Sequence, residues 1–448
     1  MAHIYLGSLD DKPTPKAVRS ALAQFQKLPQ GPSEEIKVQI LSRAYDQAME
    51  RVNGQKAGLQ ELAIQVLSWI TCAKRPLTIL ELQHALAVEA DEPDIDEENL
   101  PEVEDMVAVC AGLVRTDEES GIIRLVHYTT QEYFERTWDR WFPNAQHNIA
   151  ITCITYLAFD IFAGGSYRTK YEYRARVQKY PLYPYTAQNW GYHAHKASSA
   201  KDAVVRFLSN TAKVSAAYQA MDVVQWPKVH YDGKLLYSCP WEFLMEGMHL
   251  AAWFGLKEVT AYLLEQGWPP DCQVSGRTPL SFAAENGQKE LVDFLLEKKV
   301  VAIDAGYHSP LSYAVMRGKG AVVESLLKHG ANPNACCSSD NGYTGGVFSR
   351  ADDTALQFAV NDGNEDIVRL LLEYRADVDS VIQRVEQRQK HLALTPLTLA
   401  AQGGHEGIVK LLLDNGAAVN PKGCPSPLPF ALASGHDAIA KLLRSNGA

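Results

Sequence analysis

Several common features are missing from this sequence of 448 residues, and each absence excludes a class of protein. There is no run of about 18 apolar residues, so we expect no transmembrane helix and no membrane partner. The first residues, MAHIYLGSLDD, lack a basic segment followed by an apolar stretch and do not form a secretory signal. The eight cysteines include no C-x-x-C pair, so we expect reduced thiols in a cytoplasmic protein.

Motifs for nucleotide binding and catalysis are missing as well. A P-loop needs G-x-x-x-x-G-K-[ST], and the nearest string, RGKGA at 317–321, lacks that spacing. The string GGSYR at 164–168 lacks the G-x-S-x-G form of a nucleophile elbow. His193 and His195 have no cysteine or carboxylate at ligand spacing. We therefore expect no enzyme, no cofactor and no metal site; an enzyme with an unrecognised site in residues 135–242 is the open alternative.

Acidic side chains outnumber basic ones by 53 to 43, which gives a net charge of −10. Residues 59–134 alone hold sixteen acidic and four basic side chains, which would repel a phosphate backbone and argues against DNA binding. Residues 165–185 instead alternate Arg or Lys with Tyr. That mixture is typical of an anion or RNA surface. The favoured interpretation is that the tyrosines pack, while the charges stay solvated or pair with the acidic residues 91–105.

The tryptophans divide the chain, because all eight lie at or before Trp268. The part without them indicates a change of architecture near residue 243. There, a glycine recurs six times, each with an alanine four residues before it and a leucine eight residues after it, at Gly255, Gly287, Gly318, Gly363, Gly404 and Gly435. A period of this kind predicts a solenoid.

The strings TPLSFAA (278–284) and TPLTLAA (395–401) show how one unit is built. The threonine caps a short helix, proline occupies its first turn, and the recurrent glycine ends it before a second helix begins. This pattern resembles the ankyrin repeat, whose signature is T-P-L-H-x-A-A, over residues 243–448. Only His249 keeps the signature histidine. The resemblance implies helix–turn–helix units, each followed by a reaching loop.

Two intervals between units are long, at residues 335–352 and 381–394. We interpret both as inserted loops on the turn side, the second with a short helix in VIQRVEQRQKHLA. Arg444 stands where the other five units have leucine, which is typical of a terminal cap. The first unit is aromatic, with Trp253, Phe254 and Trp268, and we expect it to dock against the preceding domain.

The N-terminal part contains the elements of a winged helix. Apolar spacing predicts a helix over 59–71 that buries Leu59, Leu62, Val66, Leu67 and Ile70. A second helix starts at a capping box of Thr78 and Glu81, and a third lies within 100–113. The strings LVRT (113–116) and IIRLVH (122–127) predict a β-hairpin, and Thr129 with Glu132 predicts a second capping box.

The strings LSWITCAKRPLTILELQHALAVE and IIRLVHYTTQEYFER resemble the winged helix that follows the NACHT module in fungal NACHT–ankyrin proteins, which are STAND or NLR-like. That domain carries a family label taken from GPI inositol deacylases, which implies no deacylase chemistry. The chain resembles the C-terminal part of such a protein, as a truncated paralogue or a split gene. The resemblance divides it into a helical NACHT remnant (1–58), a winged helix (59–134), an aromatic-rich helical linker (135–242) and about six ankyrin units (243–448).

The resemblance also assigns a role to one histidine. In the NACHT class, the motif H-x-x-x-Q-E-[FY] carries a histidine that touches the phosphate of the bound nucleotide, and HYTTQEY makes this His127. A structural role is the favoured reading. A nucleotide-sensing role with a NACHT NTPase bound in trans stays open.

The sequence thus predicts a mainly α protein with a small winged helix, a helical linker and an ankyrin solenoid. Its function is predicted to be non-catalytic capture of a protein partner. In the ankyrin family, the variable positions just before each repeat glycine face the partner, which here gives Trp253, Phe254, Glu285, Asn286, Met316, Arg317, Asn361, Asp362, Gln402, Ala433 and Ser434.

Overall fold

The computed structural model describes residues 34–90, 92–117, 119–167, 169–222, 230–231, 234–235, 245–306, 308–335, 354–385 and 391–448. The chain forms two compact units. Unit 1 contains residues up to 207 together with 216–224 and 238–242, and unit 2 contains 208–215, 225–237 and 243–448. Each unit is described by itself, and the four-part division drawn from the sequence stays a prediction.

Unit 1 is mainly helical, and its one strand pair in the described residues is antiparallel, with Val114 opposite Leu125. Its elements, with α11 and α12 shared between the units, are α3 (Glu34–Asn53), α4 (Ala57–Cys72), α5 (Ile79–Leu86), η1 (Glu97–Asn99), α6 (Val103–Ala108), β1 (Val114–Asp117), β2 (Ile122–Leu125), α7 (Tyr128–Trp141), α8 (Ala145–Leu157), η2 (Asp160–Phe162), α9 (Lys170–Lys179), α10 (Tyr183–Lys196), η3 (Ser198–Ala200), α11 (Lys201–Leu208) and α12 (Thr211–Asp222).

Helix α4 is the centre of the winged helix and packs on α5, α6, α7 and β2. The capping box at Thr78 is confirmed, because its side chain accepts from Glu81 N–H while the Glu81 carboxylate accepts from Thr78 N–H. The capping box predicted at Thr129 is wrong. Helix α7 begins at Tyr128, and His127 is its N-cap, since His127 Nδ1 accepts from Thr129 N–H.

The buried face of α4 also differs from the prediction. Leu59 is 46% exposed, whereas Ala63 and Trp69 are buried beside Val66 and Leu67. Trp69 reaches the ring of Tyr185 on α10, with centroids 5.7 Å apart, so it anchors the winged helix to the helical segment that follows. The apolar spacing placed the helix correctly but missed the tryptophan that ties it to a later part of unit 1.

Unit 2 is a row of helix pairs with two short strand pairs in its described residues. Its elements besides the shared helices are β3 (His230–Tyr231), β4 (Lys234–Leu235), α13 (Gly247–Trp253), α14 (Lys257–Glu265), α15 (Pro279–Asn286), α16 (Lys289–Lys298), α17 (Pro310–Met316), α18 (Gly320–Lys328), α19 (Ala355–Asn361), α20 (Glu365–Glu373), β5 (Ile382–Val385), β6 (His391–Leu394), α21 (Pro396–Gly403), α22 (Glu406–Asp414), α23 (Pro427–Ala433) and α24 (Asp437–Ser445).

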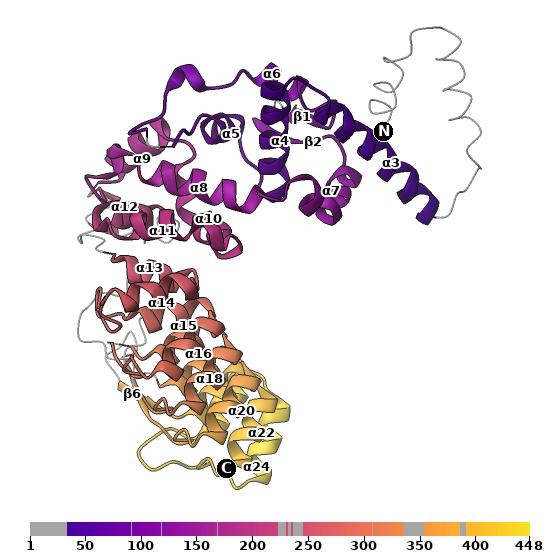
Figure 1. Cartoon of the computed structure of the whole chain (residues 1–448). Helices are drawn as coiled ribbons and strands as arrows, with labels where there is room; N and C mark the ends of the chain where they lie inside the picture. Colours follow the sequence, from indigo (N-terminus) through magenta and orange to yellow (C-terminus); the bar gives the residue numbers. More distant parts are fainter. Residues whose placement is uncertain are drawn as a thin grey trace. The chain divides into compact units, whose positions relative to one another are not determined.

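The helix pairs of unit 2 stack in two layers. The first helices, from α13 to α23, pack on one another in sequence, and the second helices, from α14 to α24, do the same (Figure 1). Thr278 and Thr395 each cap a first helix by accepting from the N–H three residues on, with proline at N1. Gly404 ends α21 with φ of +78°, the left-handed conformation that glycine adopts without strain.

The inserted segment before α21 forms a hairpin and not the short helix that the sequence predicts. Strands β5 and β6 pair antiparallel, with Ile382 opposite Leu394 and Val385 opposite His391. The two segments pair with each other over four residue pairs, and this pairing outweighed the weak helical pattern of the segment. The other predicted insertion, at 335–352, lies outside the described residues apart from residue 335. The fold is mainly α, as the sequence predicts.

Candidate functional site

The predicted partner-binding residues occupy equivalent places in the structure, at the C-terminal end of each first helix. We call this row the end strip, and it consists of Trp253, Phe254, Glu285, Asn286, Met316, Arg317, Asn361, Asp362, Gln402, Ala433 and Ser434. Because the first helices pack side by side, the row runs across all six helix pairs of the described array. Its geometry alone does not test whether these residues bind a partner.

The members of the end strip differ in exposure. Arg317, Asp362, Gln402, Ala433 and Ser434 are exposed. Trp253, Phe254, Asn286, Met316 and Asn361 are half-buried. Glu285 is buried, with 7% of its surface exposed. The strip therefore offers apolar, half-buried surface at its first unit and exposed polar groups further along.

Glu285 is held by two arginines. Arg317 Nη2 lies 2.8 Å from Glu285 Oε1, and Arg277 pairs with Glu285 Oε2. Burial raises the pKa of Glu285, but the charge of Arg277 and the hydrogen bonds from both arginines outweigh it and hold the pKa below its usual value. Glu285 is therefore an ionised carboxylate that joins the second helix pair to the third, and its oxygens are already engaged.

Aromatic rings surround Arg277. Its guanidinium carbon lies 3.9 Å from the ring centroid of Phe282 and 4.3 Å from that of Tyr313. The ring of Trp253 is 5.9 Å from that of the buried Phe282, so the aromatic contacts continue to the first helix pair. We call Trp253, Phe282, Tyr313 and Arg277 the arginine–aromatic cluster. Sequence reasoning named only Trp253 of these four, because the other three lie outside the strip positions.

A second group in unit 2 brings together ligand-type side chains. Glu246, His249 and Cys272 each place one ligand-type atom within 4.8 Å of the others. His249 is fully buried, and its Nε2 lies 3.0 Å from the carbonyl oxygen of Cys272. Burial raises the pKa of the Cys272 thiol to about 12, and Glu246 adds to this effect. Sequence reasoning expected no metal site and missed this group, although His249 stands out as the one histidine at its repeat position.

His127 lies at the N-terminus of α7 as its capping residue. Its Nδ1 lies 2.9 Å from Thr129 Oγ1 and caps α7, and Thr129 Oγ1 is 2.6 Å from the hydroxyl of Tyr45 on α3. The imidazole is half-buried, and the neighbouring Tyr128 is exposed. These contacts fit the favoured structural role, and no observation of the structure tests a nucleotide-sensing role.

The basic and aromatic residues at 165–185 pack largely as the favoured interpretation predicts. Tyr173, Tyr180, Tyr183 and Tyr185 are buried and Tyr167 is half-buried, whereas Tyr171 is exposed. Tyr180 donates to the carboxylate of Asp94 at 2.8 Å, and Lys179 Nζ lies 4.0 Å from the same carboxylate, which belongs to the acidic stretch 91–105.

Arg176 departs from that interpretation because it is buried and not solvated. It donates to the carbonyl of Gly165 at 3.0 Å, and its guanidinium carbon lies 3.8 Å from the ring centroid of Tyr167. Backbone carbonyls and an aromatic face thus replace the solvent that the sequence pattern suggested. A buried arginine with these contacts strengthens the packed reading over an anion or RNA surface.

His193 belongs to the core of unit 1. Its Nε2 is 2.9 Å from the hydroxyl of Tyr185, and its Nδ1 is 2.8 Å from Gln146 Oε1. Burial lowers the pKa of His193 to about 3, so the imidazole is neutral at physiological pH. Both ring nitrogens have partners inside the protein, which leaves neither of them for a ligand.

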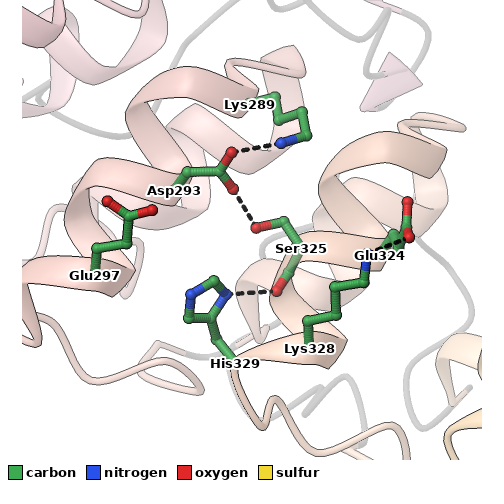
Figure 2. A pocket seen from close by; sticks show the side chains of 7 residues that line it. All are labelled: Lys289, Asp293, Glu297, Glu324, Ser325, Lys328 and His329. Carbon is green, nitrogen blue, oxygen red and sulfur yellow. Dashed lines mark hydrogen bonds and ion pairs between the residues drawn. The ribbon is translucent and has the colours of Figure 1, made fainter.

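A shallow hollow lies on the second-helix layer, between α16 and α18 (Figure 2). Its charged side chains pair with one another: Lys289 Nζ lies 2.5 Å from Asp293, which also accepts from Ser325, and Lys328 Nζ lies 2.5 Å from Glu324. His329 Nδ1 is 2.9 Å from the carbonyl oxygen of Ser325. These local pairs account for the polar lining, so we do not assign the hollow a ligand. Among the described helices, none is long and apolar enough to cross a membrane.

Comparison with known families identifies two regions. Residues 248–340, 304–382, 336–420 and 380–448 match the family "Ankyrin repeats (3 copies)". Residues 49–151 match the family "GPI inositol-deacylase, winged helix domain".

Individual relatives share parts of the chain. Human Rabankyrin-5 is 33% identical over 170 residues, which cover 32% of this chain and 14% of Rabankyrin-5. Ankyrin repeat protein nuc-2 of Neurospora crassa is 27% identical over 232 residues, which cover 43% of this chain and 20% of that protein. The ankyrin repeat domain of human ASB11 aligns with a TM-score of 0.37 and 22% identity, covering 46% of this chain and 85% of that domain.

The chain thus spans only a small part of the first two relatives. The matched families agree with the helix pairs of unit 2 and with the hairpin and helices around α4. The chain therefore carries a winged-helix domain of the GPI-inositol-deacylase type followed by ankyrin repeats.

Proposed function

We propose that the chain is a non-catalytic interaction protein that captures a protein partner on the end strip and the adjoining arginine–aromatic cluster. The observation that carries the proposal is the pair of half-buried aromatic side chains on the first helix pair, Trp253 and Phe254, together with the arginines Arg277 and Arg317 of the next two units. Trp, Tyr and Arg are the residues that most often dominate binding energy at protein interfaces. Ankyrin repeats support a protein-interaction scaffold in general, and the choice of surface is our inference.

The chemistry of this surface suggests what the partner presents. Trp253 and Phe254 offer apolar area at the first helix pair, and Arg317 offers an exposed guanidinium at the third. Arg317 already donates to Glu285, but its side chain is 41% exposed, so its guanidinium can donate to a second carboxylate. We therefore expect a partner segment with an apolar side chain followed by an acidic one.

The test compares two variants in a pull-down from the native cell. Trp253→Ala with Phe254→Ala should abolish capture, because each buried anchor contributes about 2 kcal/mol or more. Tyr262→Ala, a half-buried aromatic on α14 in the second-helix layer, is the matched control and should keep the partner. A large loss of thermal stability in the double variant would instead show that both rings serve packing, within the array or against the preceding domain. Equal capture by all three proteins would overturn the proposal.

Regulation of a NACHT NTPase in trans is the finer alternative that the family resemblance implies. It predicts that the captured partner contains a P-loop and that capture changes when Mg-ATP is added. The third alternative, an enzyme site in residues 135–242, is not supported by the described side chains there. His193 has both nitrogens engaged, Arg176 is buried on aromatic rings, and Cys153 is fully buried.

A further inference from the structure

We infer that Glu246, His249 and Cys272 form a site for one Zn²⁺ ion. The bound ion would connect α13 to the loop that leads into α15. One ligand-type atom from each residue lies within 4.8 Å of the other two. Two ligand atoms on tetrahedral Zn²⁺ stand about 3.5 Å apart, given bond lengths of about 2.0–2.3 Å. Contraction by about 1 Å would therefore complete the site.

The first unit is built differently from the other five at two of these positions. Where the other units have Thr278, Ser309, Thr354, Thr395 and Ser426, the first has Glu246. Four of those five hydroxyls cap their helices, whereas the Glu246 side chain makes no cap hydrogen bond. The carboxylate is half-buried and stands near the Cys272 thiol. The carboxylate that replaces the hydroxyl makes no cap hydrogen bond and is of a type that can bind a metal ion.

Hydrogen bonds orient the imidazole of His249 in the way that is typical of metal-binding histidines. Its Nε2 lies 3.0 Å from the carbonyl oxygen of Cys272 and 3.2 Å from that of Arg277. Because carbonyl oxygens only accept, Nε2 carries the proton and Nδ1 carries a lone pair. Nδ1 is buried and has no hydrogen-bond partner among the described residues. Metal-ligating histidines typically donate the other N–H to a carbonyl in this manner. Cys272 Sγ lies 4.0 Å from Nε2, so the sulfur has to move toward Nδ1 when both atoms bind one ion.

The set of donors selects the metal. Thiolate and imidazole suit Zn²⁺ and exclude Mg²⁺ and Ca²⁺, which prefer oxygen ligands. On binding, the Cys272 S–H bond breaks, its proton passes to solvent, and the sulfur electron pair forms the bond to the metal. Three protein ligands leave the fourth position for a water molecule.

The experiment uses the full chain, freed of metal by a chelator, with Co²⁺ as a coloured probe for Zn²⁺. We expect one equivalent of Co²⁺ to give a thiolate-to-cobalt charge-transfer band, which one equivalent of Zn²⁺ then removes. Cys272→Ala should lose the band. Cys424→Ala is the matched control, since Cys424 is also a half-buried thiol of the array but belongs to no such group among the described residues, and it should keep the band.

A second variant keeps the test valid if Cys272→Ala fails to fold. Glu246→Gln keeps the size of the side chain and removes the charged ligand, so Zn²⁺ affinity should fall by more than the roughly 10–100-fold typical of losing an outer-shell partner. Zn²⁺ should also raise the melting temperature of the native chain and of Cys424→Ala, but not that of Cys272→Ala. Absence of a charge-transfer band in the native chain, or an unchanged band in Cys272→Ala, would overturn the proposal.

Discussion

Arg317 on the third helix pair places its guanidinium 2.8 Å from the carboxylate of Glu285 on the second. The sequence predicts both residues as contacts for a partner, and the structure joins them to each other. Arg277 completes the group from the loop before α15. Glu285 therefore stabilises the contact between two helix pairs. Of these residues, only the solvent-exposed part of Arg317 is open to a partner.

The first prediction concerns the removal of this carboxylate. Glu285→Gln should lower the free energy of unfolding by about 2–3 kcal/mol, because it leaves the half-buried Arg277 without its counter-charge. The loss is smaller than for a fully buried pair, since Arg317 reaches solvent. Urea unfolding measures the change. Glu406→Gln, which removes an exposed pair with Lys410 on α22, is the control and should cost about 0.5 kcal/mol or less. Equal losses in the two variants would mean that Glu285 is no more than a surface charge.

The second prediction concerns the acid side of the stability curve. The pKa of Glu285 is lowered in the folded protein, so the ionised carboxylate stabilises the fold above its unfolded pKa, which is about 4.3. That contribution is lost as the pH falls through the lower, folded pKa. The gap in stability between the native chain and Glu285→Gln should therefore be largest near pH ~6 and shrink toward pH ~3. Parallel curves over this range would contradict the ionised state of Glu285.

The third prediction concerns the turn after α21. Gly404→Val should cost about 1–3 kcal/mol, because a β-branched residue is strained at a φ of +78°. A Cβ at this position would also stand 2.6 Å from His436 Cε1 in the next helix pair, so that ring must move. Thermal melts measure the effect. Gly320→Ala, where a Cβ meets nothing within 4 Å, is the control and should leave the melting temperature unchanged or raise it. An unchanged midpoint for Gly404→Val would refute the strain argument.

The fourth prediction concerns nucleotide. The chain alone should not bind Mg-ATP or Mg-ADP with micromolar affinity, because it lacks a P-loop. A single charge-assisted hydrogen bond from His127 is worth about 1.5–3 kcal/mol. A micromolar site needs about 8 kcal/mol. Calorimetry at millimolar nucleotide is the measurement. Micromolar binding that survives His127→Ala would reveal a pocket that we have missed, whereas binding that this change abolishes would favour the nucleotide-sensing role.

The sequence predicts a structural feature correctly where residues close together in the chain determine it. Thr78 and Glu81 cap α5 because the reciprocal hydrogen bonds involve only residues three apart. Gly404 adopts a positive φ because the following turn demands it, whatever the rest of the chain does. The six helix pairs follow from the same local pattern repeated along the sequence.

The failures arise where distant residues decide. His127 displaced Thr129 as the cap of α7, and the Thr129 hydroxyl lies beside Tyr45, which is 84 residues away in the sequence. Leu59 fits the apolar spacing of α4, yet the neighbouring elements cover a different side of that helix. From the sequence, Glu285 looks like an ordinary surface residue. Its two arginine partners become visible only when the two repeats stack on each other. The Glu246, His249 and Cys272 group also depends on a loop that returns to α13.

The hairpin of β5 and β6 interrupts the sequence between two repeats without interrupting their packing. Helix α19 still packs on α21, and α20 on α22. Loop closure costs only about 0.6 kcal/mol for each doubling of length. This hairpin is therefore a natural place to insert an epitope or a fluorescent reporter. Such a fusion would leave the helical stack of the array intact.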